Sequence, residues 1–251
     1  MTLQSLLKKS YYHLEVTFQQ EKIAKLPYYG PLIRGMLGDT FSNDNVLSEV
    51  IFKNPRIDVR PYFFYTERNG NSVTAHLMLM GFSEHFIKEV VRAIGEKETA
   101  HIGGVKCVID AMSLKKRSFM NRRIKKRFKI GFISPTAFFD GDNLSTVPSF
   151  DMVTRSLVRS VNRFTKYYVK SVYPLRVGEI PEGEIVEFEM RNYFWRHRNI
   201  RGEVIPLHGT WGWIEYEVEC MTSELKNILR LSDFFQVGRW TSYGFGKLEV
   251  I

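Results

Sequence analysis

The sequence predicts an α+β protein made of two tandem ferredoxin-like (βαββαβ) domains, with a glycine-rich loop near the C-terminus. Two observations support this prediction. Apolar residues alternate between strand spacing and helix spacing in the order β-α-β-β-α-β, and the second half of the chain repeats that order. Only the pattern repeats, because the residues of the two halves are not similar. We place the domains at residues 1–122 and 123–251.

The first half contains clear local signals for its turns and helix starts. Pro31 stands near the start of a helical pattern, Asn69-Gly70 is typical of a tight hairpin turn, and Ser83 is suited to cap a helix that stops at Gly95. The predicted elements are strand Tyr12–Gln19, helix Gly30–Phe41, strands Asp58–Thr66 and Val73–Met80, helix Ser83–Ile94 and strand Val105–Met112.

The second half gives the same order of elements. They are strand Phe128–Ile133, helix Ser149–Tyr168, strands Ile185–Trp195 and Trp211–Cys220, helix Met221–Leu231 and strand Leu248–Ile251. The long helix has an apolar stripe on one side. Basic residues spaced by three and four follow its other side: Arg155, Arg159, Arg163, Lys166 and Lys170. A solvated helix face is the alternative interpretation of this row.

The positive charge of the chain is concentrated in one segment. The 251 residues have a formal net charge of +9, and the segment Lys115–Lys129 holds nine bases and no acid, so the rest of the chain is formally neutral. Such a run repels itself unless a polyanion neutralises it. Nucleic acid is the first candidate and an anionic membrane surface the second, with a solvated linker as the alternative. We interpret Lys115–Arg127 as the hinge between the domains.

The segment from Val237 to Lys247 is rich in glycine and carries two bases and no acid. Glycine lets backbone N–H groups approach an anion closely, and successive N–H groups can cradle a phosphate. The loop is neither a P-loop nor a dinucleotide fingerprint, because it precedes a strand and no Gly-Lys-Ser/Thr opens a helix. The phosphate-binding candidates are Gly238, Arg239, Ser242, Gly244, Gly246 and Lys247. A simple turn before the last strand is the alternative.

Two cysteines, Cys107 and Cys220, lie in alternating apolar patterns, so we expect both to be buried and neither to form a disulfide or zinc site. No stretch of about 18 apolar residues indicates a membrane span. The N-terminal residues lack the order of a signal peptide. A cytoplasmic location and no membrane partner are the expectation.

Among the six histidines, His197 has the most informative surroundings. It lies between Arg196 and Arg198, with Arg201 close behind, at the end of a predicted hairpin. We expect this tip to contact nucleic acid and His197 to titrate near neutrality. We expect a structural role for His76 and a surface role for His13.

No paired carboxylates and no His/Asp/Glu cluster at metal-ligand spacing are visible, which disfavours a two-metal nuclease. We therefore expect no metal and no cofactor. The metal-free route to RNA cleavage is attack of the 2′-OH on the adjacent phosphate, with a base, an acid and stabilising cations. DNA lacks that hydroxyl and would be excluded.

Several motifs together resemble the CRISPR-associated endoribonucleases of the RAMP superfamily that process precursor CRISPR RNA (the sixth Cas family). The segments that resemble that family are Gly30–Gly38, Leu79–Phe82, Phe132–Thr136, Pro148–Phe150 and Val237–Gly246. The resemblance spans nearly the whole chain and is strongest after Lys129. It implies two ferredoxin-like folds and metal-independent cleavage of CRISPR repeat RNA, giving a 2′,3′-cyclic phosphate and a 5′-hydroxyl. It also implies other CRISPR-associated proteins as partners, and it leaves the oligomeric state open.

One departure from the family pattern concerns the catalytic residues. Some members carry a tyrosine on the first helix, a histidine shortly after it and a lysine nearby, whereas here only Lys53 matches. Our candidates for proton transfer are Lys53 and His197, and Arg196 and Arg198 are candidates for phosphate stabilisation.

Two other functions remain open from the sequence. A non-catalytic RNA-binding RAMP subunit of a ribonucleoprotein is favoured by the missing Tyr/His pair. An RNA-recognition-motif protein is suggested by Tyr243-Gly244-Phe245-Gly246 but lacks further aromatics in the following strand.

Overall fold

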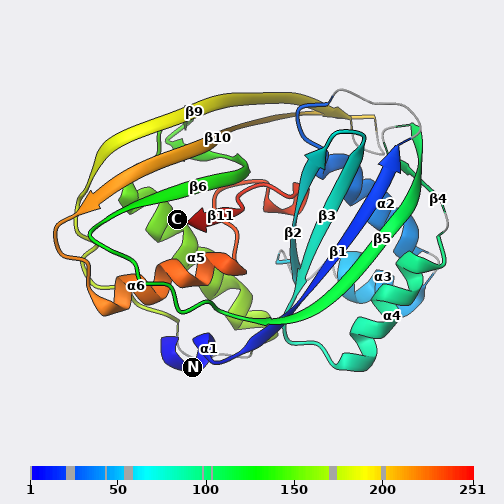
Figure 1. Ribbon diagram of the computed structural model, residues 1–251, viewed down its shortest axis with the longest axis horizontal. Helices are drawn as coiled ribbons and strands as arrows, with labels where there is room; N and C mark the ends of the chain where they lie inside the picture. Colours follow the sequence, from blue (N-terminus) through cyan, green and yellow to red (C-terminus); the bar gives the residue numbers. More distant parts are fainter. Residues whose placement is uncertain are drawn as a thin grey trace.

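The computed structural model confirms the α+β class, with two antiparallel sheets placed side by side (Figure 1). It describes the whole chain except residues 1, 21–25, 43, 54–58, 98, 103, 170–173 and 199–201. The proposed domain boundary at residue 122 falls between the two sheets and stays a prediction. None of the helices in the described part of the chain has the length and hydropathy needed to cross a membrane.

The first sheet has the strand order β2-β3-β1-β5-β4, with every pairing antiparallel. Its strands are β1 (Ser10–Gln20), β2 (Tyr62–Asn69), β3 (Ser72–Leu79), β4 (Thr99–Ile102) and β5 (Val105–Ser118). Its helices are α1 (Leu3–Leu7), α2 (Gly30–Ser42), α3 (Asn45–Ser48), the π-helix η1 (Glu49–Lys53) and α4 (Glu84–Gly95). The order β2-β3-β1-β5 is that of a ferredoxin-like sheet, and β4 is an added edge strand. The sequence analysis missed β4 because four residues are too few to show alternation.

The second sheet has the corresponding order, β11-β6-β10-β9. Its strands are β6 (Arg127–Thr136), β9 (Gly183–Arg198), β10 (Val204–Val218) and β11 (Leu248–Val250), and a small ribbon pairs β7 (Phe138–Asp140) with β8 (Asn143–Ser145). Its helices are α5 (Phe150–Tyr168), α6 (Ser223–Arg230) and the 3₁₀ turns η2 (Leu231–Asp233) and η3 (Thr241–Tyr243). Helices α2, α4, α5 and α6 each bury an apolar side in the core, as the apolar stripes predict, whereas the short helix α1 packs against α6.

Hydroxyl side chains fix where the main helices begin. Ser83, Ser149 and Thr222 each accept a hydrogen bond from the backbone N–H three residues later, at 3.2 Å. These bonds satisfy donors that the first turn of a helix leaves free. The two serines were predicted as helix starts from the sequence.

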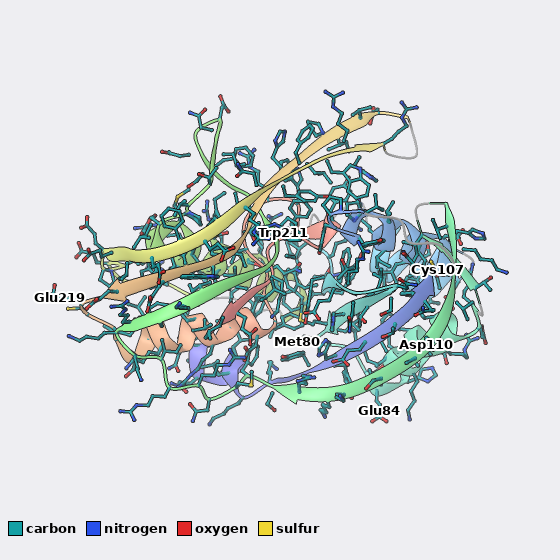
Figure 2. All side chains as sticks on the ribbon, turned by 45° about the horizontal axis from the view of Figure 1, so that its top comes forward. Met80, Glu84, Cys107, Asp110, Trp211 and Glu219 are labelled. Atoms are coloured by element: carbon teal, nitrogen blue, oxygen red, sulfur yellow. The ribbon has the colours of Figure 1, made fainter. Side chains whose placement is uncertain are left out.

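The two domains share a hydrophobic core. Phe63 of β2 and Met80, which follows β3, are buried in the same cluster as Phe164 of α5 and Phe234. The rings of Phe63 and Phe234 lie 5.3 Å apart in an edge-to-face arrangement, which aromatic pairs prefer. Figure 2 shows Met80 between the two domains, far from Glu219 on one side and from Cys107 on the other. The cleft described below is therefore built on a packed interface.

A second contact between the domains comes from the long β9–β10 hairpin, which extends from the second domain toward the first (Figure 1). Tyr193 and Leu207 of this hairpin form a small buried cluster with Phe245 of the glycine-rich loop and with Tyr28, just before α2. The hydroxyl of Tyr28 also donates to the carbonyl oxygen of Gly244. The hairpin, the loop and the start of α2 are thus held together.

Three expectations are corrected by the structure. The basic run is not simply a hinge, because its first residues, Lys115–Ser118, continue strand β5. Cys220 is exposed, since it follows the end of β10, whereas Cys107 is buried as expected. His13 is buried, with 8% of its surface exposed, because its side of β1 is covered at the junction of the two domains.

Candidate nucleic-acid interface

A cleft of about 660 Å³ lies at the junction of the two domains. Helix α5 and the ribbon strand β7 form part of its wall, the glycine-rich loop another part, and the start of β2 with Val59 and Arg60 lines it from the first domain. The lining mixes apolar and polar side chains and is rich in arginine and hydroxyl groups: Arg60, Arg155, Arg159, Arg163, Arg239, Thr241 and Ser242 are among its residues. Cationic side chains from both domains therefore face one cavity.

The arginine row of α5 is exposed along this cleft. Arg155 is held by Asp151, one turn earlier, with Nε 2.7 Å from the carboxylate. Among the described residues, neither Arg159 nor Arg163 has a carboxylate within ion-pair distance. A phosphate could therefore pair with these two arginines by displacing solvent counterions. The helical spacing predicted from the sequence thus places all three arginines in one site.

The glycine-rich loop lies at the cleft, but the backbone N–H groups of its three glycines already have partners within the protein. Gly244 N–H donates to Thr241 O at 3.0 Å, Gly246 N–H to Pro135 O at 3.0 Å, and Gly238 N–H to the hydroxyl of Ser156 at 2.8 Å. The premise that these glycines offer free N–H groups to a phosphate is therefore wrong. Their positive φ angles and close neighbours explain the glycines instead.

Replacing Gly246 by alanine is expected to destabilise the fold by about 2–4 kcal/mol. Its φ is +86°, and an added Cβ would stand 1.9 Å from the carbonyl oxygen of Val237. Gly244→Ala meets the Tyr28 hydroxyl at 2.7 Å and should also be destabilising. Chemical denaturation measures both effects. The control is Gly70→Ala, where φ is +57° but nothing lies within 4 Å, so only the smaller conformational cost remains.

Lys247 is a second correction within the loop. Its side chain is buried, and its ammonium donates to the carbonyl oxygens of Ser232 at 2.7 Å and Asp233 at 2.9 Å. Burial lowers the pKa of Lys247 to about 8. Lys247 therefore fixes the turn at η2 and does not line the cleft. Arg239 and Ser242 do line it, and the guanidinium of Arg239 stacks over Phe139, with 4.3 Å between Cζ and the ring centroid.

His197 lies where the hairpin, the glycine-rich loop and α2 meet. Its ring centroid is 5.2 Å from that of Tyr243. The same Tyr243 ring is contacted by Arg34 of α2, whose guanidinium carbon lies 4.4 Å from the ring centroid. Tyr243 directly follows Ser242, which lines the cleft. The 3₁₀ turn η3 therefore connects the arginine-lined cleft to the cluster of His197, Tyr243 and Arg34, which we call the His197 group.

The surroundings of His197 favour its neutral form. Burial lowers the pKa of His197 below its usual value, and the nearby charge of Arg34 lowers it further. A neutral imidazole at pH 7 can accept a proton, which is what a general base must do. Arg34 was missed by the sequence analysis because a lone arginine on an amphipathic helix gives no signal of what will pack against it.

Replacing Arg34 by methionine should raise the pKa of His197, because the substitution removes a positive charge and keeps most of the side-chain volume. NMR titration of the His197 ring protons measures the shift directly. Arg68→Met, on the exposed part of β2, is the control and should leave the titration unchanged. An unchanged His197 pKa in Arg34→Met would show that the two groups are not electrostatically coupled.

The other predicted site residues are placed as follows. Arg196 and Arg198 are exposed on β9, on either side of His197. Arg201 lies outside the described residues. Lys53 ends η1, but its side chain is not among those that the structure describes, so its proposed role stays a prediction. Arg60 of the first domain also lines the cleft, and no pattern in the sequence had identified it as a site residue.

The structure consists of two ferredoxin-like domains that meet at a cationic cleft. Residues 130–248 match the model of a family described as CRISPR-associated endoribonuclease Cas6. The resemblance to the sixth Cas family inferred from the motifs is therefore confirmed. The match covers most of the second domain.

Solved structures of the same fold include several Cas6 proteins. One Cas6 product complex has 17% sequence identity, covers 97% of this chain and 100% of its own, and gives a TM-score of 0.69. Thermus thermophilus Cas6 has 15% identity, covering 97% and 99%, with a TM-score of 0.62. The product of a Cas6-related gene from Pyrococcus furiosus has 14% identity, covering 96% and 98%, with a TM-score of 0.54. No curated protein matches the sequence.

Proposed function

We propose that this protein is an endoribonuclease that binds CRISPR repeat RNA along the arginine-lined cleft and cleaves it without a metal ion. The 2′-OH would attack the adjacent phosphate, giving a 2′,3′-cyclic phosphate and a 5′-hydroxyl. The observation that carries the proposal is the position of His197: its ring packs against Tyr243, which directly follows the cleft residue Ser242, and burial and the charge of Arg34 lower its pKa.

Electrostatics support RNA as the ligand. The cleft is lined by five arginines from both domains and by only two carboxylates, Asp140 and Asp151, of which Asp151 is engaged by Arg155. A phosphate backbone crossing this surface would exchange solvent counterions for arginines, which is the main source of affinity in such complexes. Ser242 and Thr241 add hydroxyl donors at the same wall. The family match to an RNA-cleaving family agrees with this ligand.

The chemistry follows from the residues near His197. A neutral imidazole can take the proton of the 2′-OH, and the guanidinium of Arg34 can stabilise charge on the phosphorane. Arg196 and Arg198 alternate with His197 along β9, so their side chains face the other side of the strand, where they stay proposed contacts to the RNA. Lys53 remains the second candidate for proton transfer. This set of groups contains bases and cations but no carboxylates, a composition that suits acid–base cleavage better than coordination of Mg²⁺, which prefers oxygen ligands.

The alternative is a non-catalytic RNA-binding RAMP subunit, which would use the same cleft. RNA carrying a 2′-deoxy substitution before the scissile phosphate separates the two. The enzyme should bind this RNA about as tightly as the unmodified repeat but not cleave it, because only the nucleophile is lost. Tight binding with no cleavage of any unmodified repeat RNA would support the subunit. Cleavage of the deoxy RNA would contradict the 2′-OH mechanism.

A further inference from the structure

A second group of titratable side chains, which the sequence analysis did not foresee, lies away from the arginine-lined cleft. His13 and Glu15 on β1 and His76 on β3 come together in a cavity of about 470 Å³. The antiparallel register explains this meeting: Glu15 pairs directly with His76, and His13 is two residues along on the same face. The absence of a metal-ligand cluster, inferred from spacing along the chain, is therefore corrected.

The two imidazoles face each other across a short gap. Nε2 of His13 lies 3.2 Å from Nδ1 of His76, and each residue has only 8% of its surface exposed. The ring of His76 is stacked on that of Tyr65, with 4.4 Å between centroids and 4° between planes. This stacking holds the His76 ring in place, so the donor geometry is set before any ligand arrives.

The outward nitrogen of each imidazole faces a carboxylate. Nδ1 of His13 is 3.6 Å from Glu15, and Nε2 of His76, which has no hydrogen-bond partner, is 3.5 Å from Glu67. Carboxylates hold the ring protons on the nitrogens that face them. Without a metal, the inward nitrogens share one proton in an N–H···N hydrogen bond. With both ring protons on the outward nitrogens, two lone pairs face each other and can bind a cation between them.

We propose that His13 and His76 bind a divalent transition-metal ion such as Zn²⁺, with Glu15 as the third ligand. Two nitrogens bound tetrahedrally to Zn²⁺ at about 2.0–2.1 Å would lie about 3.3 Å apart, close to the observed separation. Glu15 has a carboxylate oxygen within 4.8 Å of a ring nitrogen of each imidazole. To become a ligand, its side chain must leave Nδ1 of His13 and Arg117, its partners in this structure. Glu67 is the outer-shell partner of His76.

The charges around the cavity are compatible with a cation. Its lining has four carboxylates, those of Glu15, Glu67, Asp233 and Glu249, against Arg117, Arg122 and Lys247. The imidazole donors select Zn²⁺, Co²⁺, Ni²⁺ or Cu²⁺ over Mg²⁺ and Ca²⁺. The bound ion would join two adjacent strands of the first sheet at the junction with the second domain. Its role is therefore structural, and no residue of the His197 group takes part.

The test uses the full-length protein, freed of metal by EDTA and dialysis, and titrated with ZnCl₂, CoCl₂ or MgCl₂. We expect one Zn²⁺ or Co²⁺ per chain and a rise in Tm of about 5–10 °C at a hundredfold excess over Kd. Mg²⁺ should have no effect. Tetrahedral Co²⁺ should give visible absorption. His13→Gln and His76→Gln should lose this binding, whereas His101→Gln, an exposed control on β4, should retain it.

Three results would overturn the proposal: no binding by the wild-type protein, equal binding by all three variants, or an unchanged wild-type Tm with Zn²⁺. If the cavity variants do not fold, NMR of the wild type decides the matter. Zn²⁺ should then shift the ring signals of His13 and His76 but not those of His85 and His101. RNA cleavage that persists in EDTA while Tm falls would separate this site from the proposed catalytic site.

Discussion

Replacing His197 by alanine is expected to slow single-turnover cleavage of repeat RNA by about 10²–10⁴-fold, the usual contribution of a positioned acid or base. RNA affinity should change little, because the neutral imidazole carries no charge to a phosphate. The measurement is the single-turnover rate with protein in excess, across pH 5–9. The wild-type rate should rise with pH through the lowered His197 pKa and then level off, whereas the residual variant rate should lack that step.

The control for His197→Ala is His101→Ala, which also removes an imidazole from a strand, but an exposed one on β4 of the first domain. It should cleave at the wild-type rate. A change below about threefold in His197→Ala would remove this residue from the mechanism. Lys53 and the dispersed arginines would then remain as the candidates.

Replacing Arg159 and Arg163 together by glutamine is expected to weaken RNA binding and to flatten its salt dependence. Each phosphate contact on a single strand contributes about 0.7 to the slope of log Kd against log salt, so the pair should lower that slope by about 1.4. Arg155→Gln should have a smaller effect on affinity, because Asp151 already neutralises this side chain. Binding measured between low and physiological salt gives both quantities.

Arg92→Gln is a matched control for this series. Arg92 lies exposed on helix α4 and is paired with Glu89 and Glu96, away from the cleft. Its substitution should leave both the affinity and the slope unchanged. Equal losses in Arg92→Gln and in the α5 variants would mean that the net charge of the protein, and not the cleft, governs binding.

Local signals in the sequence predicted most of the fold. The turn at Asn69-Gly70 and the serine caps are encoded by a few adjacent residues, and long amphipathic helices such as α5 show their buried side directly. Short strands were missed because they hold too few residues to show an alternating apolar pattern: β4 has four residues, and β7 and β8 have three each. The basic run was misjudged at Lys115–Ser118, where strand pairing with β1 continues despite the charges.

The candidate site was only partly predictable, since its parts come from distant segments. Regular spacing on one helix identified Arg155, Arg159 and Arg163, and it required no knowledge of the tertiary structure. The contacts of His197 with Tyr243, and of Tyr243 with Arg34, depend on the hairpin reaching the first domain, which no local pattern shows. The sequence singled out the glycines of the loop, but composition alone could not show that their N–H groups form hydrogen bonds within the protein.

The account is tested most directly by incubating the purified protein with end-labelled CRISPR repeat RNA in excess EDTA and identifying the ends of the products. We expect cleavage at one site, with a 2′,3′-cyclic phosphate on the upstream fragment and a 5′-hydroxyl on the downstream fragment. Cleavage that requires added Mg²⁺, or products with a 3′-hydroxyl and a 5′-phosphate, would contradict it.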